Sequence, residues 1–444
     1  MLALTQLIRR PGRNRVHPAI KTAVTPEQLT QQILDQLTRE PLKNLNVRLW
    51  NGSLWPDDQP KAAMLVLKRP SALREILLAD SEAAVGEAYL DNAFDVEGNM
   101  EAAFELADHL MESTQGWTRK LEIAYLLKKL PESPICSCDD SRHLPTRGSK
   151  HSVRRDHEAI QFHYNVSNDF YALWLDKQMA YSCAYFKDPS EDLEEAQQNK
   201  FDLICRKLGL RSGQRLLDIG CGWGGLVLHA AEHYRVHAVG VTLSEQQLQY
   251  AQEAVQRRGL ERQIRLHLHD YRELRELEQY DAISSVGMVE HVGRENLSVY
   301  FRKARHLLKP GGLFLNHGIG LGPVPFPGKS GSFIQQHVFP DSDLVSINDM
   351  LQPAENAGWE IRDVECLREH YAQTLRHWVQ RLEAAHDQAL SFVSESTYRI
   401  WRLYMSGCAH NFQTGRLSIY QSLLAKVDPK GASRAPSVRS MWYS

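Results

Sequence analysis

The stretch from Arg215 to Gly225 constrains the fold more than any other part of the sequence. Leu216 to Ile219 is a short apolar run, typical of a buried strand, that carries Asp218 near its end and leads into a cluster of glycines. An amphipathic segment, Leu226 to Tyr234, follows at once. We therefore predict a strand, a glycine turn and a helix. Such a turn is either an ordinary tight connection or a place where backbone N–H groups approach a nucleotide-like ligand, because glycine has no Cβ.

Strand and helix patterns alternate regularly after this turn. The helix before it is expected over Leu193–Leu208, and further strands at Val236–Val241, Ile264–Leu268, Tyr280–Val286 and Leu313–His317. Ser244 and Gln247 have the spacing of a capping box for the helix that ends near Gly259. Regular alternation of this kind predicts an α/β fold with a mainly parallel sheet, covered by helices, whose ligand lies at the carboxyl ends of the strands.

The region before residue 156 has a different character. Val47–Trp50 and Ala63–Leu67 are expected to be strands with a turn at Asn51-Gly52. Glu87–Leu110 is expected to be largely helical, with breaks at Asn92 and Gly98. These elements indicate a small α+β accessory domain. Pro131–Arg155 has no periodicity and is rich in Pro, Ser, Cys and basic residues, so it is the best candidate for a linker, although a loop of this length can also be a lid.

Composition narrows the class of protein. The chain has 444 residues, of which 43% are hydrophobic and 24% charged, and its net charge of −2 argues against a nucleic-acid binder. Five cations and no acid precede Glu27, which predicts either a solvated tail or an arm that contacts anionic lipid. No apolar run approaches the roughly 20 residues of a membrane span, and we expect neither a secretory signal nor a disulfide framework. The seven scattered cysteines favour the cytoplasm.

The cofactor can be narrowed from the position of the acids. A dinucleotide-binding turn requires G-x-G-x-x-G and an acid at the end of the second strand. Here the third glycine comes early, the second strand ends in Thr242, and the acid precedes the glycines as Asp218. An acid in that position suits a cationic ligand without a pyrophosphate, so S-adenosylmethionine fits better than NAD.

Two aromatic stretches precede the glycine turn. They run from Phe162 to Tyr171 and from Tyr181 to Phe186, and both mix aromatic with polar residues. They indicate either a packing segment or a surface that faces a ligand.

Several motifs together resemble the cyclopropane-fatty-acyl-phospholipid synthases and the related mycolic-acid-modifying enzymes. The resemblance extends from about Asp156 to about Leu424 and is carried by Tyr181–Phe186, Leu217–Gly225, Gly240–Ser244, Asp270–Leu274, Ser285–Gly293 and Ser406–Ala409. It implies a Rossmann-like class I methyltransferase with a mainly parallel seven-stranded sheet and a small α+β N-terminal domain. The implied division is an accessory, lipid-binding domain with its basic arm at 1–130, a linker at 131–155, the methyltransferase domain at 156–425 and a tail at 426–444.

The resemblance also implies the site residues. Those expected around S-adenosylmethionine are Tyr181, Ser182, Leu216, Asp218, Gly220, Cys221, Gly222, Gly224, Thr242, Leu243, Ser244, Gln247, Asp270, Tyr271 and Arg272. Those expected around a bound bicarbonate ion are Cys183, Glu290, His317, Ile319 through its backbone, and Tyr371. Cys408 lies in a further family motif; no covalent step requires it as a nucleophile, which favours packing or a substrate channel. No metal is implied.

The implied reaction is methyl transfer to a cis double bond of a phospholipid acyl chain, followed by loss of a proton to close a cyclopropane ring. An alkene is a poor nucleophile, so the site must be dry and oriented. Because the substrate is a membrane phospholipid, the protein is expected on the cytoplasmic face of the inner membrane, in peripheral contact with unsaturated phospholipid. Dimerisation is common among the bacterial relatives, so a homodimer is also expected. His317-Gly318-Ile319 and the Gly320–Ser332 stretch depart from the common family pattern, so substrate preference is open.

Three other readings remain. The same scaffold can give a methylene- or methyl-branched fatty acid, relatives methylate amines, and a silent lipid-binding protein is the reading from a different class. The retained Cys183, Glu290, His317 and Tyr371 argue against the last two, because neither an amine substrate nor a silent protein needs a bicarbonate base.

Overall fold

The computed structural model describes residues 24–38, 44–113, 117–132, 152, 155, 166–275, 279–326, 333–339 and 342–443. The basic arm, nearly all of the proposed linker and the first four residues of the first aromatic stretch lie outside these residues. The chain packs as two units. One comprises 1–143, 326–338 and 399–410, and the other 144–325, 339–398 and 411–444. These units are divided by packing and are not continuous in sequence, and the linear domain boundaries stay a prediction.

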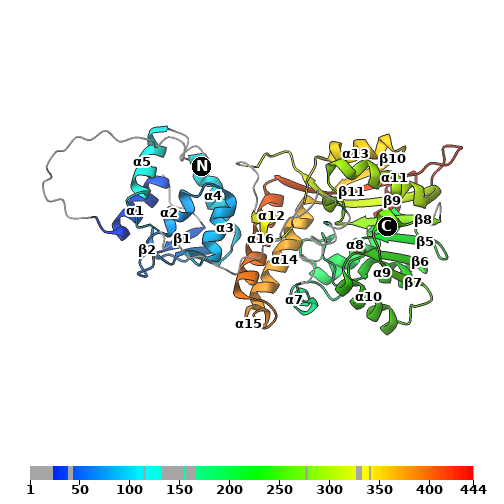
Figure 1. Cartoon of the computed structure of the whole chain (residues 1–444), viewed down its shortest axis with the longest axis horizontal. Coiled ribbons are helices and arrows are strands. Elements are labelled where there is room, and N and C mark those ends of the chain that lie inside the picture. Colours follow the sequence, from blue (N-terminus) through cyan, green and yellow to red (C-terminus); the bar gives the residue numbers. More distant parts are fainter. Residues whose placement is uncertain are drawn as a thin grey trace. The chain divides into compact units, whose positions relative to one another are not determined.

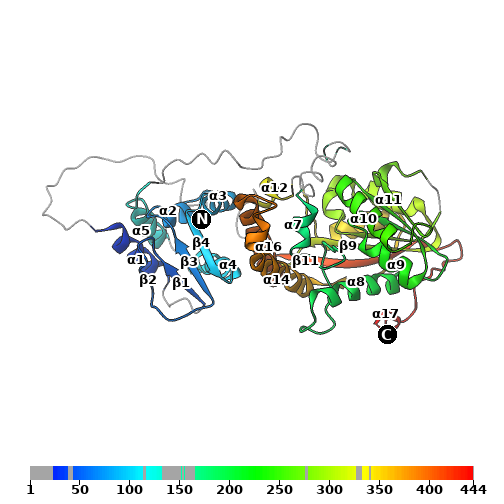
Figure 2. The ribbon, with the colours of Figure 1, turned by 90° about the horizontal axis from the view of Figure 1, so that it is seen from below.

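The N-terminal unit is built on a four-stranded sheet in the order β2-β1-β3-β4, which Figure 2 shows. Its elements are α1 (Pro26–Leu37), β1 (Leu45–Arg48), β2 (Leu54–Trp55), β3 (Ala63–Leu67), α2 (Ala72–Leu77), α3 (Glu82–Leu90), β4 (Phe94–Gly98), α4 (Glu101–Ser113) and α5 (Trp117–Leu127). The expectation that Glu87–Leu110 is largely helical is wrong between the two expected breaks, where β4 pairs antiparallel with β3. Phe94 and Val96 are buried and alternate with polar residues, which is a strand period.

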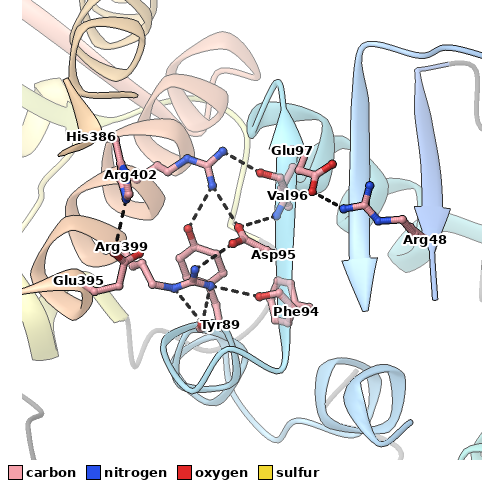
Figure 3. Close-up of polar contacts among 10 residues, drawn as sticks. All are labelled: Arg48, Tyr89, Phe94, Asp95, Val96, Glu97, His386, Glu395, Arg399 and Arg402. Carbon is pink, nitrogen blue, oxygen red and sulfur yellow. Dashed lines mark hydrogen bonds and ion pairs between the residues drawn. The ribbon is translucent and has the colours of Figure 1, made fainter. Parts of the chain in front are cut away.

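Two arginines of α16 (Glu395–Gln413) complete this unit (Figure 3). The Arg399 guanidinium donates to Asp95 Oδ2 at 2.9 Å and to the Tyr89 carbonyl, and it lies 3.9 Å from the centre of the Tyr89 ring. Arg402 donates to the Asp95 carboxylate at 3.3 Å and to the Val96 carbonyl at 2.8 Å. Both arginines are buried, and such groups are retained only when their donors find acceptors. The two arginines therefore tie the middle of α16 to β4.

The second unit is the predicted α/β layer structure. Its seven-stranded sheet has the order β10-β11-β9-β8-β5-β6-β7, and Figure 1 labels its strands. The strands are β5 (Arg215–Ile219), β6 (His237–Thr242), β7 (Ile264–Leu268), β8 (Tyr280–Val286), β9 (Leu308–Leu321), β10 (Glu360–Cys366) and β11 (Leu417–Ala425). β11 runs antiparallel to both of its neighbours, and the pairs among β5 to β9 are parallel. The prediction of a mainly parallel seven-stranded sheet is confirmed.

Helices of this unit cover both faces of the sheet. They are α7 (Asn168–Ala172), α8 (Leu193–Lys207), α9 (Gly225–Tyr234), α10 (Glu245–Arg257), α11 (Leu297–Leu307), α13 (Ile347–Asn356), α14 (Arg368–Ala384), α15 (His386–Ala389) and α17 (Ser440–Tyr443); α12 (Phe333–His337) packs with the N-terminal unit. Leu216 packs with α8 and α9, whereas its neighbour Leu217 packs with α11 and α13. Successive strand residues face opposite sides, so Asp218 faces the same side as Leu216.

The structure refines two local predictions, the length of the fifth strand and the cap of α10. The expected fifth strand is longer than Leu313–His317, because β9 begins at Leu308, directly after α11, and continues to Leu321. Ser244 does cap α10, with its hydroxyl accepting from Gln247 N at 3.3 Å. The Gln247 side chain does not return this bond. Its Oε1 accepts from the Thr242 hydroxyl at 2.8 Å, which fixes both side chains at the end of β6.

Candidate functional site

A cavity opens at the carboxyl ends of β5, β6, β7 and β8. Strand order reverses at β5, since the chain continues to β6 and β7 on one side and to β8 and β9 on the other. Such a switch point leaves a crevice that sequence-consecutive connections do not fill. Of the residues expected at the cofactor, those that line the cavity are Tyr181, Ser182, Asp218, Gly220, Cys221, Gly222, Thr242, Leu243, Gln247, Asp270, Tyr271 and Arg272.

The remaining residues expected at the cofactor do not line the cavity but lie next to residues that do. Leu216 is fully buried in the core of the sheet. Gly224 has φ +88° and begins α9, and a Cβ there would lie 3.1 Å from the Cβ of Ala251. Ser244 caps α10. These residues shape the turn and the helix without lining the cavity, so their assignment to cofactor binding stays a prediction.

Asp218 is the acid that the cavity holds on β5. It is 3% exposed, and the Ser284 hydroxyl donates to its Oδ1 at 2.7 Å. Burial raises the pKa of Asp218 to about 6, and the Ser284 hydrogen bond and the charge of Lys200 oppose this shift. At neutral pH the group is therefore mostly a carboxylate, which suits a cationic ligand.

A second constellation lies where β9 pairs with β11. Glu290 follows β8 in a short 3-10 turn (Val289–His291), and its Oε1 accepts from Ile319 N at 2.6 Å. His317 and Gln421 are partners in the β9–β11 pair, and Gln421 Nε2 lies 3.1 Å from His317 Nδ1. Glu290 Oε2 and His317 Nε2 are both buried and have no hydrogen-bond partner among the described residues. Buried polar atoms without partners are costly, so these two atoms are candidates for contact with a bound polar ligand.

The protonation of this pair follows from its burial. Burial raises the pKa of Glu290 to about 7, against the Ile319 hydrogen bond, so its carboxyl group can hold a proton near neutral pH. Burial also places the pKa of His317 well below its ordinary value, which keeps the imidazole neutral. A carboxyl that carries a proton can donate it to a small anion, and a neutral imidazole can donate through one ring nitrogen.

Cys183 and Tyr371 both contact the carbonyl of Leu367, which lies beside β11. Cys183 Sγ lies 3.7 Å from the Leu367 carbonyl, which also accepts from Tyr371 N at 3.1 Å. Leu367 N in turn donates to the carbonyl of Ile419, the β11 partner of Ile319. One contact of the Cys183 side chain and two backbone hydrogen bonds of Leu367 thus connect Cys183 and Tyr371 to the strand that pairs with Ile319. The Cys183 thiol is fully buried, and burial raises its pKa, so it is a thiol and not a thiolate.

Aromatic rings join this constellation to the cavity. Tyr181, which lines the cavity, has its ring centre 5.2 Å from that of Trp378, and Trp378 lies 6.0 Å from Tyr371. Trp223 lines the cavity as well and contacts Tyr171 at 4.9 Å. The aromatic residues of Tyr181–Phe186 thus include one that faces the cavity. Ring faces are negative and can stabilise a cation that forms beside them.

Cys408 belongs to the other packing unit. It lies in the part of α16 that packs with the N-terminal unit, and it is buried, which raises the pKa of its thiol. A buried protonated thiol is a poor nucleophile, so packing is the simpler role. Its catalytic assignment stays a prediction.

Sequence reasoning missed part of the lining. Met179, Lys200, Phe201, Trp223, His269, Met288, His291 and Val292 also line the cavity. Lys200 is the clearest omission, because it is 1% exposed on α8 although lysine is almost never fully buried unless it is paired. The available signal was its spacing, since Lys200 and Ile204 lie four residues apart on the buried face of a helix.

Comparisons with known proteins place the chain in a family of methyltransferases. The chain matches the family described as "Mycolic acid cyclopropane synthetase" over residues 151–422. It is 38% identical over 402 residues to a "Probable fatty acid methyltransferase" of Pseudomonas putida, covering 90% of this chain and 96% of the relative. It is also 39% identical over 264 residues to the cyclopropane-fatty-acyl-phospholipid synthase of Escherichia coli K12, covering 60% of this chain and 66% of that protein.

A solved structure gives the same picture. The crystal structure of mycolic acid cyclopropane synthase CmaA1 in complex with SAH and CTAB superposes with a TM-score of 0.58. The two proteins are 36% identical, and the match covers 61% of this chain and 98% of the other. The two proteins are therefore similar in sequence as well as in fold. The second unit has the class I methyltransferase fold.

Proposed function

This chain belongs to the mycolic acid cyclopropane synthetase family of S-adenosylmethionine-dependent methyltransferases, and we propose that it forms cyclopropane fatty acids. In this proposal it transfers a methylene group from S-adenosylmethionine to the cis double bond of an unsaturated phospholipid acyl chain. The observation that carries the proposal is the pair of unpartnered buried atoms, Glu290 Oε2 and His317 Nε2, next to a cavity suited to a cationic cofactor.

The residues around that pair fit bicarbonate. A small anion bound here would meet two donors, the protonated Glu290 carboxyl and the neutral His317 ring, and both of the atoms concerned lack other partners among the described residues. Bicarbonate, when bound, supplies a base that can take a proton from a newly transferred methyl group. Glu290 and His317 would hold it, and Gln421 would orient the His317 ring. Cys183 and Tyr371 would close the surroundings against water.

The cavity residues supply the other half of the reaction. S-adenosylmethionine carries a sulfonium and an ammonium charge, which the Asp218 carboxylate complements. After methyl transfer the acyl chain carries the positive charge. Tyr181 and Tyr371, joined through Trp378, would place aromatic faces near that charge. A saturated chain offers no double bond, so turnover should require unsaturation.

A second outcome has support from the comparisons. The relative from Pseudomonas putida and one from Mycobacterium tuberculosis, 33% identical over 422 residues, are both named probable fatty acid methyltransferases. A methyl- or methylene-branched product needs the same cofactor and the same first step. We retain the branched fatty acid as the alternative product. The branched and the cyclopropane products differ in how the carbocation loses its charge.

The substrate is expected at a membrane surface. No helix among the residues the structure describes is both long enough and apolar enough to cross a bilayer. Peripheral contact with the cytoplasmic face, in which the basic residues before Glu27 take part, and dimerisation are parts of the proposal that rest on the family resemblance and the sequence.

The test is release of S-adenosylhomocysteine by the purified protein. Vesicles of dioleoyl phospholipid should support release, and matched vesicles of dipalmitoyl phospholipid should not. Release from both at the same rate would show that the double bond is not the acceptor. Release only with a soluble amine would replace the proposal by amine methylation.

A further inference from the structure

Lys200 is a buried cation whose donors are largely uncommitted. It lies on α8, is 1% exposed and lines the cavity. Its Nζ donates to the Ser182 hydroxyl at 2.7 Å and lies 4.3 Å from the centre of the Phe201 ring. The structure gives Nζ no other hydrogen bond among the described residues. An ammonium group has three N–H donors, so two of them remain available in a desolvated place, where an unpaired charge is costly.

The position of this ammonium group is fixed by its own helix. Gln197 lies one turn earlier on α8, and its amide donates to the carbonyls of Ala180 at 3.2 Å and Ser182 at 2.9 Å. The segment that contains Tyr181 and Ser182 is therefore tied to α8 at three points. Lys200 and the Ser182 hydroxyl are held beside each other as one unit at the cavity wall.

The other charges of the cavity leave a place for an anion. Arg272, the other side chain with a permanent positive charge in the lining, is paired with Asp270 at 2.7 Å. Asp218 supplies a carboxylate for cations. The amino-acid part of S-adenosylmethionine carries a carboxylate in addition to its ammonium and sulfonium groups. Burial lowers the pKa of Lys200 to about 8, and the charges of Asp176, Cys183 and Asp218 oppose this shift without a direct ion pair to Lys200 among the described residues.

We propose that Lys200 Nζ and Ser182 Oγ together bind the carboxylate of the amino-acid part of S-adenosylmethionine. The inference rests on the S-adenosylmethionine site proposed above and adds a subsite to it. With the carboxylate held by Lys200 and the cationic groups near Asp218, the cofactor has one orientation in the cavity. Lys200 is a positioning residue, because it fixes the direction of the sulfonium methyl group without contacting the reacting carbon.

The test compares two ligands that differ only in the carboxylate. Binding of S-adenosylhomocysteine and of its decarboxylated amine analogue is measured by titration calorimetry. Charge-assisted hydrogen bonds are roughly twice as strong as neutral ones, so the wild-type protein should prefer S-adenosylhomocysteine by about tenfold or more. Lys200→Met should remove this preference by weakening S-adenosylhomocysteine while leaving the analogue within about twofold of wild type.

Two further variants separate the subsite from general stability. Lys207→Met is the matched control, since Lys207 is also a buried lysine of α8 but pairs with Glu365 and Asp363 and does not line the cavity. It should keep the full preference. Ser182→Ala should reduce the preference in part, which provides the test if Lys200→Met does not fold.

The outcomes distinguish this inference from the proposed function. Preference retained in Lys200→Met, or equal weakening of both ligands, would overturn the carboxylate subsite while leaving S-adenosylmethionine binding in place. If the wild-type protein bound neither ligand, the cofactor assignment itself would fail.

Discussion

Glu290→Gln should stabilise the protein at alkaline pH while removing most of its activity. Glu290 is 7% exposed, and its folded pKa of about 7 compares with 4.5 for a free glutamate. The folded state therefore binds a proton that the unfolded state has lost between these two values. Stability from this group is complete below about pH 4.5, declines as pH rises to about 7, and stays low above it.

The magnitude follows from the two pKa values. One pH unit corresponds to about 1.4 kcal/mol, so the interval from 4.5 to about 7 costs the wild-type protein about 3 kcal/mol at pH 8. Glutamine has nearly the same shape, cannot ionise, and can still accept from Ile319 N through its amide oxygen. The free energy of unfolding of the variant should therefore exceed that of the wild type by up to this amount at pH 8, and the two should differ little at pH 4.

Urea unfolding at the two pH values measures this effect. Glu261→Gln, a change at an exposed carboxyl, is the control and should show no comparable pH-dependent gain. In the same preparations, turnover of Glu290→Gln should fall by about 10²-fold or more, because the proton held at the anion site is lost, while S-adenosylhomocysteine binding is kept. A variant that is less stable than wild type at pH 8, or as active, would refute the assignment of a buried carboxyl that holds a proton.

Three further variants test other parts of the structure. His317→Ala should keep S-adenosylhomocysteine binding, measured by calorimetry, and lose about 10²-fold or more in turnover. Gly318→Ala places a Cβ 2.1 Å from Val289 Cγ1, beside Glu290, so turnover should fall and Val289→Ala should restore part of it. Asp95→Ala leaves Arg399 without its carboxylate and should cost roughly 2–4 kcal/mol in urea unfolding; a cost below the level of an exposed ion pair would contradict the packing of α16.

Strand and helix positions in the second unit could be predicted because local pattern and tertiary environment agree there. Leu216 and Leu217 are both apolar since helices cover both faces of β5, and a strand buried on both faces is nearly continuously apolar. β4 was missed because five residues between two helical patterns are too few for periodicity to outweigh the flanking signal. Its assignment needs the pairing with β3, which is not a local property.

The candidate site was predictable to different extents at its two ends. The turn from Asp218 to Gly222 has a local cause, since the backbone conformation at Gly220, with φ +80°, requires glycine. The approach of Glu290 to Ile319 depends on how β8 and β9 end beside each other, and only the family resemblance pointed to it. Lys200 escaped prediction because its significance lies in burial, which a charged residue in a helix pattern does not reveal.

In the proposed reaction a methyl group reaches the double bond and then loses a proton to a base held near Glu290. S-adenosylmethionine whose transferred methyl group is fully deuterated allows both steps to be followed by mass spectrometry of the acyl product. We expect a product that has lost one deuteron from that group and that resists the hydrogenation which reduces a methylene group. A product that keeps the whole deuterated methyl group would contradict this reaction.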